Sequence, residues 1–354
     1  MVIGIVCEFN PFHQGHQHLI RTVKKDGDAV ICAMSGNFVQ RGEMAVTDKF
    51  TRTKAALEGG ADLVIEIPTV CATRSAGGFA EAGVQLLEAT GLCDALAFGA
   101  ECDDVTALQA LASTLNEQDG AVKAAMAQGL SYPAARKAVI PSPLLDTPNN
   151  LLAIEYLRCT KLQPIAVKRI GKGHDSDDPA YSASAIRAGM DDRTIASLRH
   201  CESAVLYQLR KMNEADFALI EDVSEGLENR IVQAVKTARS LEELYALIKT
   251  KRYTHSRIRR IILRAFLGIT AASEKQPQYL RILGFSVKGK ELLPALKNTA
   301  VLPTVAKYSD AKALGGKALA QFEQESRFTD IYSLGFCPPR PCGLEKSSPL
   351  VILE

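Results

Sequence analysis

Short apolar runs alternate with amphipathic segments through the first half of the chain, and this alternation restricts the possible folds more than any other feature. We predict strands over residues 2–6, 28–34, 62–68, 94–100 and 164–170, with helices near 19–23, 49–57, 79–89 and 105–115. The repeat has the length of βαβ units. We therefore predict an α/β fold with a doubly wound parallel sheet, in which ligands bind beyond the carboxyl ends of the strands.

The first strand leads directly into Asn10-Pro-Phe-His-Gln-Gly-His16, and a helical pattern follows. Two histidines therefore lie where a strand gives way to a helix. A helix N-terminus presents unpaired N–H groups and favours an anion such as a phosphate. Imidazoles at that place can donate hydrogen bonds to a triphosphate whose charge shifts during transfer. Histidine is also scarce, since His13, His16 and His18 are half of the six in the chain. These facts favour a nucleotide site over a surface or structural role.

Three further polar segments follow predicted strands: Ser35 to Gly42, Gly99 and Arg169. The carboxyl ends of parallel strands share one edge of a sheet, so these segments and the histidines should meet in one crevice.

The bulk composition sets few limits. At 354 residues the chain is long enough for two domains, and its net charge of +2 predicts no global affinity for polyanions. It has no apolar run of membrane-spanning length and no signal-peptide pattern, so we expect a cytoplasmic protein with no membrane partner. Cys337 and Cys342 have no second Cys or His pair nearby, so we expect no metal site.

Strand signals fade after about residue 198, and helical patterns cover 205–212, 227–237, 241–248 and 256–267. We therefore predict a nucleotide-binding domain over residues 1–190 and a mainly helical, basic domain over 191–354. The last stretch, from residue 276, contains strand-like pieces and many prolines that suggest no clear organisation.

Two other segments carry candidate ligands. In Ser182-Ala-Ser-Ala-Ile-Arg187, either Ser182 or Ser184 can cap a short helix; alternatively, the serine hydroxyls and the Arg187 guanidinium can hold distant phosphates. Asn149 and Asn150 precede another helix and can either cap it or contact a nucleoside.

The segment 249–264 holds seven Lys or Arg residues, and no Asp or Glu occurs from Leu244 to Ser273. Apolar residues at helical spacing predict one buried face, with Arg257, Arg260 and Arg264 on another face. A basic stretch is usually a solvated face. One without nearby carboxylates favours contact with an RNA backbone, and an anionic membrane surface is a weaker alternative. We expect this face to lie away from the histidine crevice.

Together, HQGH, SGNFVQRGE, DKFTRTKAALEGGADLVIEIP, FGAE, PNN, VKRIG, SASAIR and LIKTKRYTHSRIRRI resemble the bacterial tRNA(Met) cytidine acetate ligases. This family belongs to the HxGH nucleotidyltransferase superfamily. The resemblance extends to about residue 290 and implies a two-step reaction. ATP and acetate would give acetyl-adenylate and pyrophosphate. The N4 amine of the wobble cytidine in elongator tRNA(Met) would then take the acetyl group, giving N4-acetylcytidine and AMP.

The resemblance also implies residue roles, with His13 and His16 as the catalytic pair and Mg²⁺ accompanying the ATP. The implied ATP-binding residues are Val6, Cys7, Glu8, Phe9, Asn10, Pro11, Phe12, His13, Gln14, Gly15, His16, Gln17, His18, Leu19, Gly99, one or both of Asn149 and Asn150, Arg169, Ile170, Ser184 and Arg187. The basic segment supplies the expected tRNA contacts, which are Lys249, Lys251, Arg252, Arg257, Arg260 and Arg264.

Two other functions fit part of the pattern. One is a nucleotidylyltransferase that joins AMP or CMP to a small phosphate ester and stops there. The other is a non-catalytic RNA-binding protein that retains a nucleotide fold. The acid-free basic segment counts against the first, and the intact HQGH and SASAIR segments count against the second.

Overall fold

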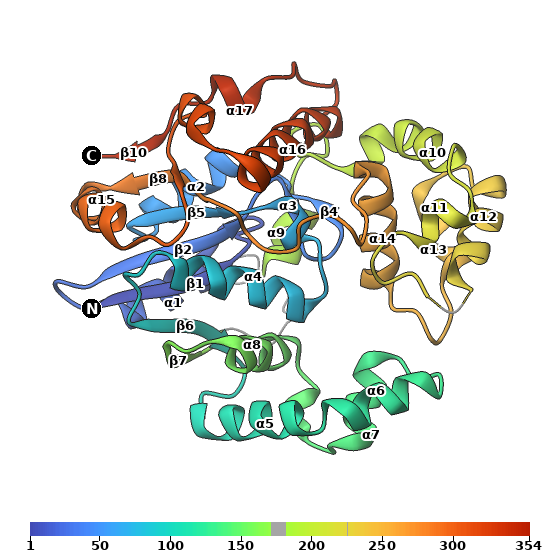
Figure 1. The fold of residues 1–354 in the computed structure, drawn as a ribbon, viewed down its shortest axis with the longest axis horizontal. Coiled ribbons are helices and arrows are strands. Elements are labelled where there is room, and N and C mark those ends of the chain that lie inside the picture. Colours follow the sequence, from blue (N-terminus) through green and yellow to red (C-terminus); the bar gives the residue numbers. More distant parts are fainter. Residues whose placement is uncertain (171–181, 225) are drawn as a thin grey trace.

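The fold is taken from a computed structural model that describes residues 1–170, 182–224 and 226–354. Its central sheet has the strand order β10-β8-β5-β2-β1-β6-β7, with β9 paired to β8 (Figure 1). The first-half strands are β1 (Val2–Cys7), β2 (Ala29–Ser35), β5 (Leu63–Ile67), β6 (Ala95–Ala100) and β7 (Gln163–Lys168). All neighbours among these strands are parallel. The predicted doubly wound sheet is confirmed, and each predicted strand lies within two residues of its observed bounds.

Helices cover both faces of this sheet. The first-half helices are α1 (Gln14–Val23), α2 (Lys49–Glu58), α3 (Thr69–Ala72), α4 (Ala76–Ala89), α5 (Val105–Glu117), α6 (Asp119–Ala127), α7 (Tyr132–Val139), α8 (Pro148–Cys159) and α9 (Ala183–Ala188). One buried cluster joins α1 and α2 to one face of the sheet, and another joins α4, α5 and α8 to the opposite face. The helices α5, α6 and α7 extend from α8 as an arm beside the sheet (Figure 1). A short hairpin of β3 (Phe38–Val39) and β4 (Glu43–Met44) follows β2.

From β1 the strands are added in one direction, through β2 to β5. The chain then returns to the other side of β1 to form β6, so the strand order reverses between β1 and β6. Ligands of doubly wound sheets bind at this reversal, beyond the carboxyl ends of the strands. The segment after β1 is Glu8 to His16, so the topology alone places the HQGH turn at the expected binding edge.

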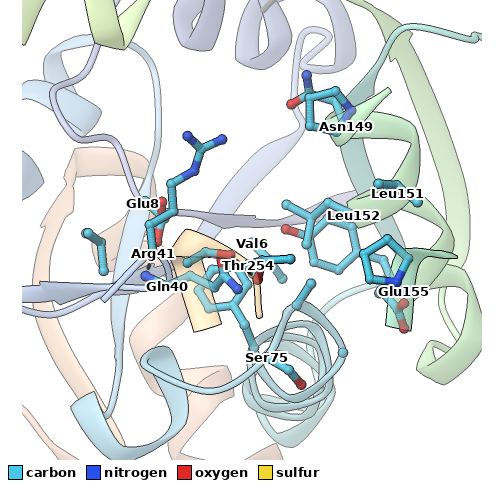
Figure 2. A pocket seen from close by; sticks show the side chains of 18 of the residues that line it. Val6, Glu8, Gln40, Arg41, Ser75, Asn149, Leu151, Leu152, Glu155 and Thr254 are labelled. Carbon is cyan, nitrogen blue, oxygen red and sulfur yellow. Dashed lines mark hydrogen bonds between the residues drawn. The ribbon is translucent and has the colours of Figure 1, made fainter. Parts of the chain in front are cut away.

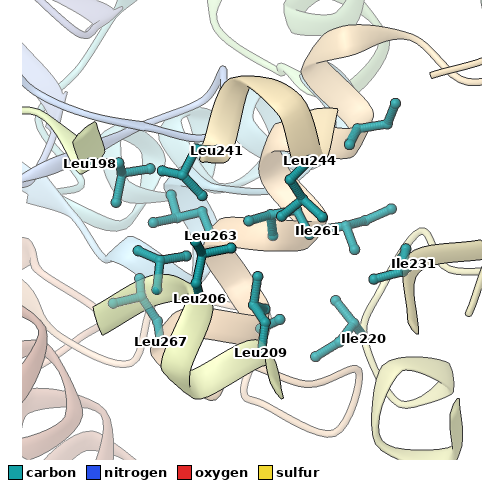
Figure 3. Packing of buried hydrophobic residues seen from close by; sticks show 14 of the residues in the cluster. Leu198, Leu206, Leu209, Ile220, Ile231, Leu241, Leu244, Ile261, Leu263 and Leu267 are labelled. Carbon is teal, nitrogen blue, oxygen red and sulfur yellow. The ribbon is translucent and has the colours of Figure 1, made fainter. Parts of the chain in front are cut away.

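A helical unit follows, built from α10 (Glu202–Arg210), α11 (Glu214–Ala218), α12 (Leu227–Thr237), α13 (Leu241–Ile248) and α14 (His255–Leu267). Leucine and isoleucine side chains fill its interior (Figure 3). These helices confirm the helical patterns read from the sequence. The apolar cluster continues into Phe38, Phe328 and Tyr332, so the unit packs directly on the sheet domain.

The end of the chain requires a correction to the predicted helical domain over 191–354. It forms β8 (Leu280–Ser286), α15 (Val287–Thr299), β9 (Thr304–Val305), α16 (Gly316–Tyr332), α17 (Leu344–Ser347) and β10 (Val351–Leu353). Strand β8 pairs antiparallel with β5, and β10 pairs parallel with β8. These elements belong to the first domain, because β8 and β10 extend its sheet beyond β5. Without β8, the backbone of β5 would form an unpaired sheet edge. No sequence pattern near residue 280 indicates which earlier strand it will join.

Buried ion pairs hold this returning segment in place. Lys49 of α2 contacts both Glu66 of β5 and Glu345 of α17, and Arg281 of β8 pairs with Glu345 at 3.0 Å. All four side chains are at most 3% exposed. Removing one charge of such a group leaves the others without compensation, so the network ties α17 and β8 firmly to the sheet.

Candidate active site

A cavity of about 1250 Å³ opens at the carboxyl ends of β1, β6 and β7. The lining includes Val6 of β1, Glu8 just after β1, Gly99 of β6, and Arg169 and Ile170 after β7. Figure 2 shows Glu8, Gln40 and Arg41 on one side of this space and Leu151, Leu152 and Glu155 of α8 on the other. The segments expected to converge therefore do converge on one crevice.

The two motif histidines form a closed unit at the start of α1. His13 is the residue before the helix, and its Nδ1 accepts a hydrogen bond from the N–H of Gly15 at 3.0 Å. The Nδ1 of His16 accepts a hydrogen bond from the N–H of His13 at 3.3 Å. The two rings stack with their centroids 3.7 Å apart. This is a capping box made of imidazoles, and it fixes the orientation of both rings before any ligand binds.

The surroundings keep both histidines neutral. Burial, together with the positive charges of Arg169 and Arg187, lowers the pKa of His13 to about 4. Burial and the adjacent His13 lower the pKa of His16 well below its usual range. Because each Nδ1 accepts a backbone hydrogen bond, each ring carries its proton on Nε2. The pair therefore presents Nε2–H donors without bringing two positive charges into contact.

Arg187 joins the far side of the site to this turn. Its Nη1 donates to the carbonyl oxygen of Asn10 at 2.7 Å, and its Nη2 donates to the Ser184 hydroxyl at 3.1 Å. Ser182 caps α9 by accepting from the N–H of Ala185. Ser182, Ser184 and Arg187 all line the cavity, but the Ser182 hydroxyl is engaged as the helix cap, whereas the Ser184 hydroxyl bonds to Arg187.

Asn149 and Asn150 face different surroundings. Asn149 lines the cavity, and its side chain lies between Glu101 and Arg169, at 2.6 Å and 3.4 Å. Asn150 is only 3% exposed, and its side-chain oxygen accepts from the N–H of Cys102 at 2.9 Å. The geometry selects Asn149 as the candidate ligand, because the Asn150 side chain is used to hold the loop after β6.

The cavity contains most of the ATP-binding residues that the resemblance implies. The residues that line it are Val6, Cys7, Glu8, Phe9, Asn10, His13, Gly15, His16, His18, Leu19, Gly99, Asn149, Arg169, Ile170, Ser184 and Arg187. Pro11, Phe12, Gln14, Gln17 and Asn150 do not line it. Phe12 instead packs edge-on against Phe9, with ring centroids 5.0 Å apart, and supports the turn from behind.

Arg52 of α2 supports the site, and no sequence pattern indicates this role. It is 1% exposed and donates to the carbonyl oxygens of Glu8, Ser35, Gly36 and Thr47. One guanidinium thus joins the ends of β1 and β2. It can hold the backbone at Glu8 in place while ligands enter and leave.

The helical arm contributes a wall that sequence reasoning also missed. Residues of α6, α7 and α8, among them Met126, Tyr132, Arg136 and Glu155, line the same cavity. No sequence motif identifies these residues, because the helices that contain them have an ordinary amphipathic pattern. Only the packing of α4 and α5 against α8 brings this wall to the binding edge.

The basic segment needs two corrections. First, Arg264 is 1% exposed and Arg260 is 8% exposed, so neither belongs to an open phosphate-binding face, although Arg260 lines the cavity. Arg264 donates to the carbonyl oxygen of Val70 and lies 3.1 Å from Glu221, while Arg260 pairs with Asp222 at 3.2 Å. The missing local carboxylates are thus supplied by the loop between α11 and α12.

Second, the segment does not lie away from the histidine crevice. Arg252, His255, Arg257 and Arg259 line the same cavity, and Figure 2 shows Thr254 facing it. Arg257 also donates to the carbonyl oxygen of Asp222 at 2.6 Å. Lys251 is exposed and Lys249 is partly exposed, so both remain available to an outside partner.

Two further findings concern metals and membranes. Within residues 1–170, 182–224 and 226–354, no cluster of three His, Cys, Asp or Glu side chains could hold a metal ion. In the same ranges, no helix is both long and apolar enough to cross a membrane.

The sheet is doubly wound, and an HxGH turn with neutral imidazole donors lies at its reversal point, in a cavity that Arg169 and Arg187 also line. These features are those of the HxGH class of nucleotidyltransferases. Comparison with known proteins agrees, since the family model described as HIGH Nucleotidyl Transferase matches residues 1–203 and 190–341. The tRNA(Met) cytidine acetate ligase of Acetivibrio thermocellus is 35% identical, over 99% of this chain and all of that protein. The ligase of the same name from Thermoanaerobacter sp. is 36% identical over the same shares.

Solved structures extend this likeness to three dimensions. Thermotoga maritima TmcAL, in its apo crystal structure, is 31% identical with a TM-score of 0.91 over 99% of both chains. The same protein bound with alpha-thio ATP superimposes with a TM-score of 0.89 over the same shares. This chain belongs to the tRNA(Met) cytidine acetate ligase family of HxGH nucleotidyltransferases.

Proposed function

We propose that this protein is an ATP-dependent acetate ligase that forms acetyl-adenylate and transfers the acetyl group to N4 of the wobble cytidine of elongator tRNA(Met). The observation that carries the proposal is the pair of neutral, stacked histidines at the reversal point of the sheet. The chain that holds them is similar over its whole length to tRNA(Met) cytidine acetate ligases. Thermotoga maritima TmcAL, whose fold this chain shares, also binds alpha-thio ATP. The cytoplasmic location expected from the sequence is part of the proposal.

In the first step, an acetate oxygen attacks the α-phosphorus of ATP, and the bond between that phosphorus and the bridging oxygen of pyrophosphate breaks. We assign the Nε2–H groups of His13 and His16 to the phosphate oxygens whose charge increases. Arg187 and Ser184 would hold the departing pyrophosphate, while Asn149, Arg169 and Ile170 would contact the nucleoside. Neutral imidazoles suit this role, because they donate hydrogen bonds without exchanging protons with the phosphates at neutral pH.

Mg²⁺ is also part of the proposal. It usually binds through substrate phosphates and one or two carboxylates rather than in a dedicated protein cage. Glu8 lines the cavity beside the HQGH turn and is a suitable carboxylate. The ion would neutralise charge on the phosphates.

In the second step, the cytidine N4 forms a bond to the acetyl carbon, AMP leaves with the electrons of the C–O bond, and the N4 proton passes to solvent. The exocyclic amine is a weak nucleophile because its lone pair is delocalised into the ring, and a mixed anhydride is reactive enough to accept its attack. Lys249, Lys251, Arg252 and Arg257 would contact the tRNA backbone around the cavity mouth.

The test is pyrophosphate release by the purified protein with ATP and acetate, with and without tRNA(Met), followed by analysis of the tRNA for N4-acetylcytidine. Acetate-dependent release and acetylated tRNA are expected. Acetyl-CoA without ATP should give no product, and modification under that condition would exclude the adenylate route. Propionate should react slowly, because excluding one methylene contributes only about 1–3 kcal/mol of discrimination.

A further inference from the structure

Arg136 of α7 has one hydrogen-bonding edge that no described residue uses. Its side chain is 4% exposed and lines the cavity, and its Nη1 donates to Glu155 Oε1 at 2.7 Å. Within the described part of the chain, its Nε and Nη2 atoms have no hydrogen-bond partner. These two atoms form one side of the guanidinium, which is the fork that binds two adjacent acceptors. A buried charged donor without a partner is costly, so such a fork points to a ligand.

Glu155 fixes the position of this fork and is itself fully engaged. Its carboxylate accepts from Arg136, from the Tyr132 hydroxyl at 3.4 Å and from Arg158 at 3.2 Å. A Cβ at Gly77 would lie 3.2 Å from Glu155 Oε2, so the N-terminal backbone of α4 also approaches this carboxylate. The negative charge is therefore compensated within the protein, and the fork remains for an outside acceptor pair.

The cavity that Arg136 lines also has aromatic and apolar side chains in its wall. The Tyr132 ring is 5.2 Å from the Arg136 guanidinium carbon, and Phe79, Met126 and Leu152 are among the other lining residues. Glu155, which holds the fork, follows the candidate nucleoside ligand Asn149 by six residues on α8. This spacing separates the two positions by about 9 Å along the helix. With a volume of about 1250 Å³, the cavity is larger than a typical pocket for one small molecule. A second ligand can therefore occupy it beside the nucleotide.

We propose that the Arg136 fork binds the Watson–Crick edge of the acceptor cytosine, donating from Nε and Nη2 to its N3 and O2. This inference rests on the proposed function, since it assigns the binding site of the second substrate. The fork leaves N4 free to attack the acetyl carbon. Uracil carries a hydrogen on N3, which would face a donor of the fork, so the same contact discriminates between the two pyrimidines.

Arg136→Lys tests this role, because lysine keeps a cation beside Glu155 but lacks the fork. Acetate-dependent ATP–pyrophosphate exchange without tRNA should stay within about twofold of wild type. Acetyl transfer to tRNA should fall roughly tenfold to a hundredfold, the range for loss of a bidentate base contact. As a second readout, a wobble-uridine transcript is used as a competitor. Wild type should prefer the cytidine transcript, and the variant should bind both transcripts about equally.

Lys137→Gln is the matched control, since Lys137 is the next residue of α7, is half-exposed and pairs with Asp146. It should leave both half-reactions unchanged. A raised KM for acetate in the exchange reaction of Arg136→Lys would mean that the fork holds acetate, and would overturn the inference. Equal losses in both half-reactions, with a lower melting temperature, would mean that Arg136 is structural and would overturn it too. If wild type shows neither reaction, the proposed function itself fails.

Discussion

The HQGH turn and the basic helix α14 line the same cavity, yet the sequence predicted one of them far better than the other. In the turn, the hydrogen bonds that orient the two imidazoles join residues 13–16, and the aromatic rings packed on His16 are those of the nearby Phe9 and Phe12. In α14, the partners of Arg260 and Arg264 are Asp222, Glu221 and Val70, which lie 38 to 194 residues away in the chain. Local spacing therefore determines function where a site is built from one segment. A run of charges acquires its role only when distant segments fold against it.

The same contrast separates an exposed from a buried basic residue of the segment 249–264. Lys251 has a solvated side chain, whereas Arg264, thirteen residues later, is a buried link between the helical unit and α3. The two were grouped by the sequence because both are cationic and no acid lies nearby in the chain. Long arginine side chains can equally serve to join two packed units, because the guanidinium offers five donors to carbonyls and carboxylates.

The largest expected effect is at the histidine turn. His13→Asn and His16→Ala should each reduce acetate-dependent ATP–pyrophosphate exchange by about 10²–10³-fold, the usual cost of losing one donor to a developing charge. Binding of tRNA, measured by filter retention, should change little. Arg21→Ala, on the exposed face of the same helix, is the control. Near-normal exchange in either histidine variant would show that the turn is structural.

The second effect concerns Arg264 as a structural link. Arg264→Met should lower the free energy of unfolding by about 2 kcal/mol, measured by urea denaturation. This is less than the loss expected for a fully buried pair, because Glu221 is 22% exposed. The salt dependence of tRNA binding should not change. If the variant is as stable as wild type and its log affinity for tRNA depends less steeply on log salt, Arg264 contacts the RNA and this interpretation is wrong.

The third effect is a pH dependence of stability. The pKa of His13 is about 4 in the folded chain, against 6.5 for an unperturbed imidazole, so the unfolded chain binds its proton first as the pH falls. This contribution to stability is present above pH 6.5 and is lost as the pH falls toward 4. Wild type should therefore lose more stability between pH 7 and 5 than His13→Asn, which keeps a capping acceptor. Equal losses would mean that His13 is charged in the folded protein.

The smallest effect concerns the lysines that remain open to solvent. Lys249→Gln combined with Lys251→Gln should lower the slope of log affinity for tRNA against log salt by about 0.7–0.9 for each lost phosphate contact. Acetyl-adenylate formation without tRNA should be unchanged. An unchanged slope would show that both lysines are solvated rather than bound to RNA, and would leave the cavity mouth as the main contact surface.

The sequence by itself determined the parallel sheet, the position of the HQGH turn at its binding edge, and the helices of the central unit. These features depend on hydrophobic periodicity and on residues close together in the chain, such as the Nδ1 of His13 and the N–H of Gly15. The choice of Ser182 as the helix cap is of the same local kind, although the sequence left Ser184 as an alternative.

Only the tertiary structure decided where residues 280–353 belong, which arginines are buried, and which helices wall the cavity. The pairing of β8 with β5 joins residues about 220 apart, and the Arg136–Glu155 pair joins two helix positions that belong to no recognisable motif. Burial and pairing depend on which surfaces meet after the chain has folded. An arginine in a polar segment has the same local pattern whether it faces water, a carboxylate or a substrate.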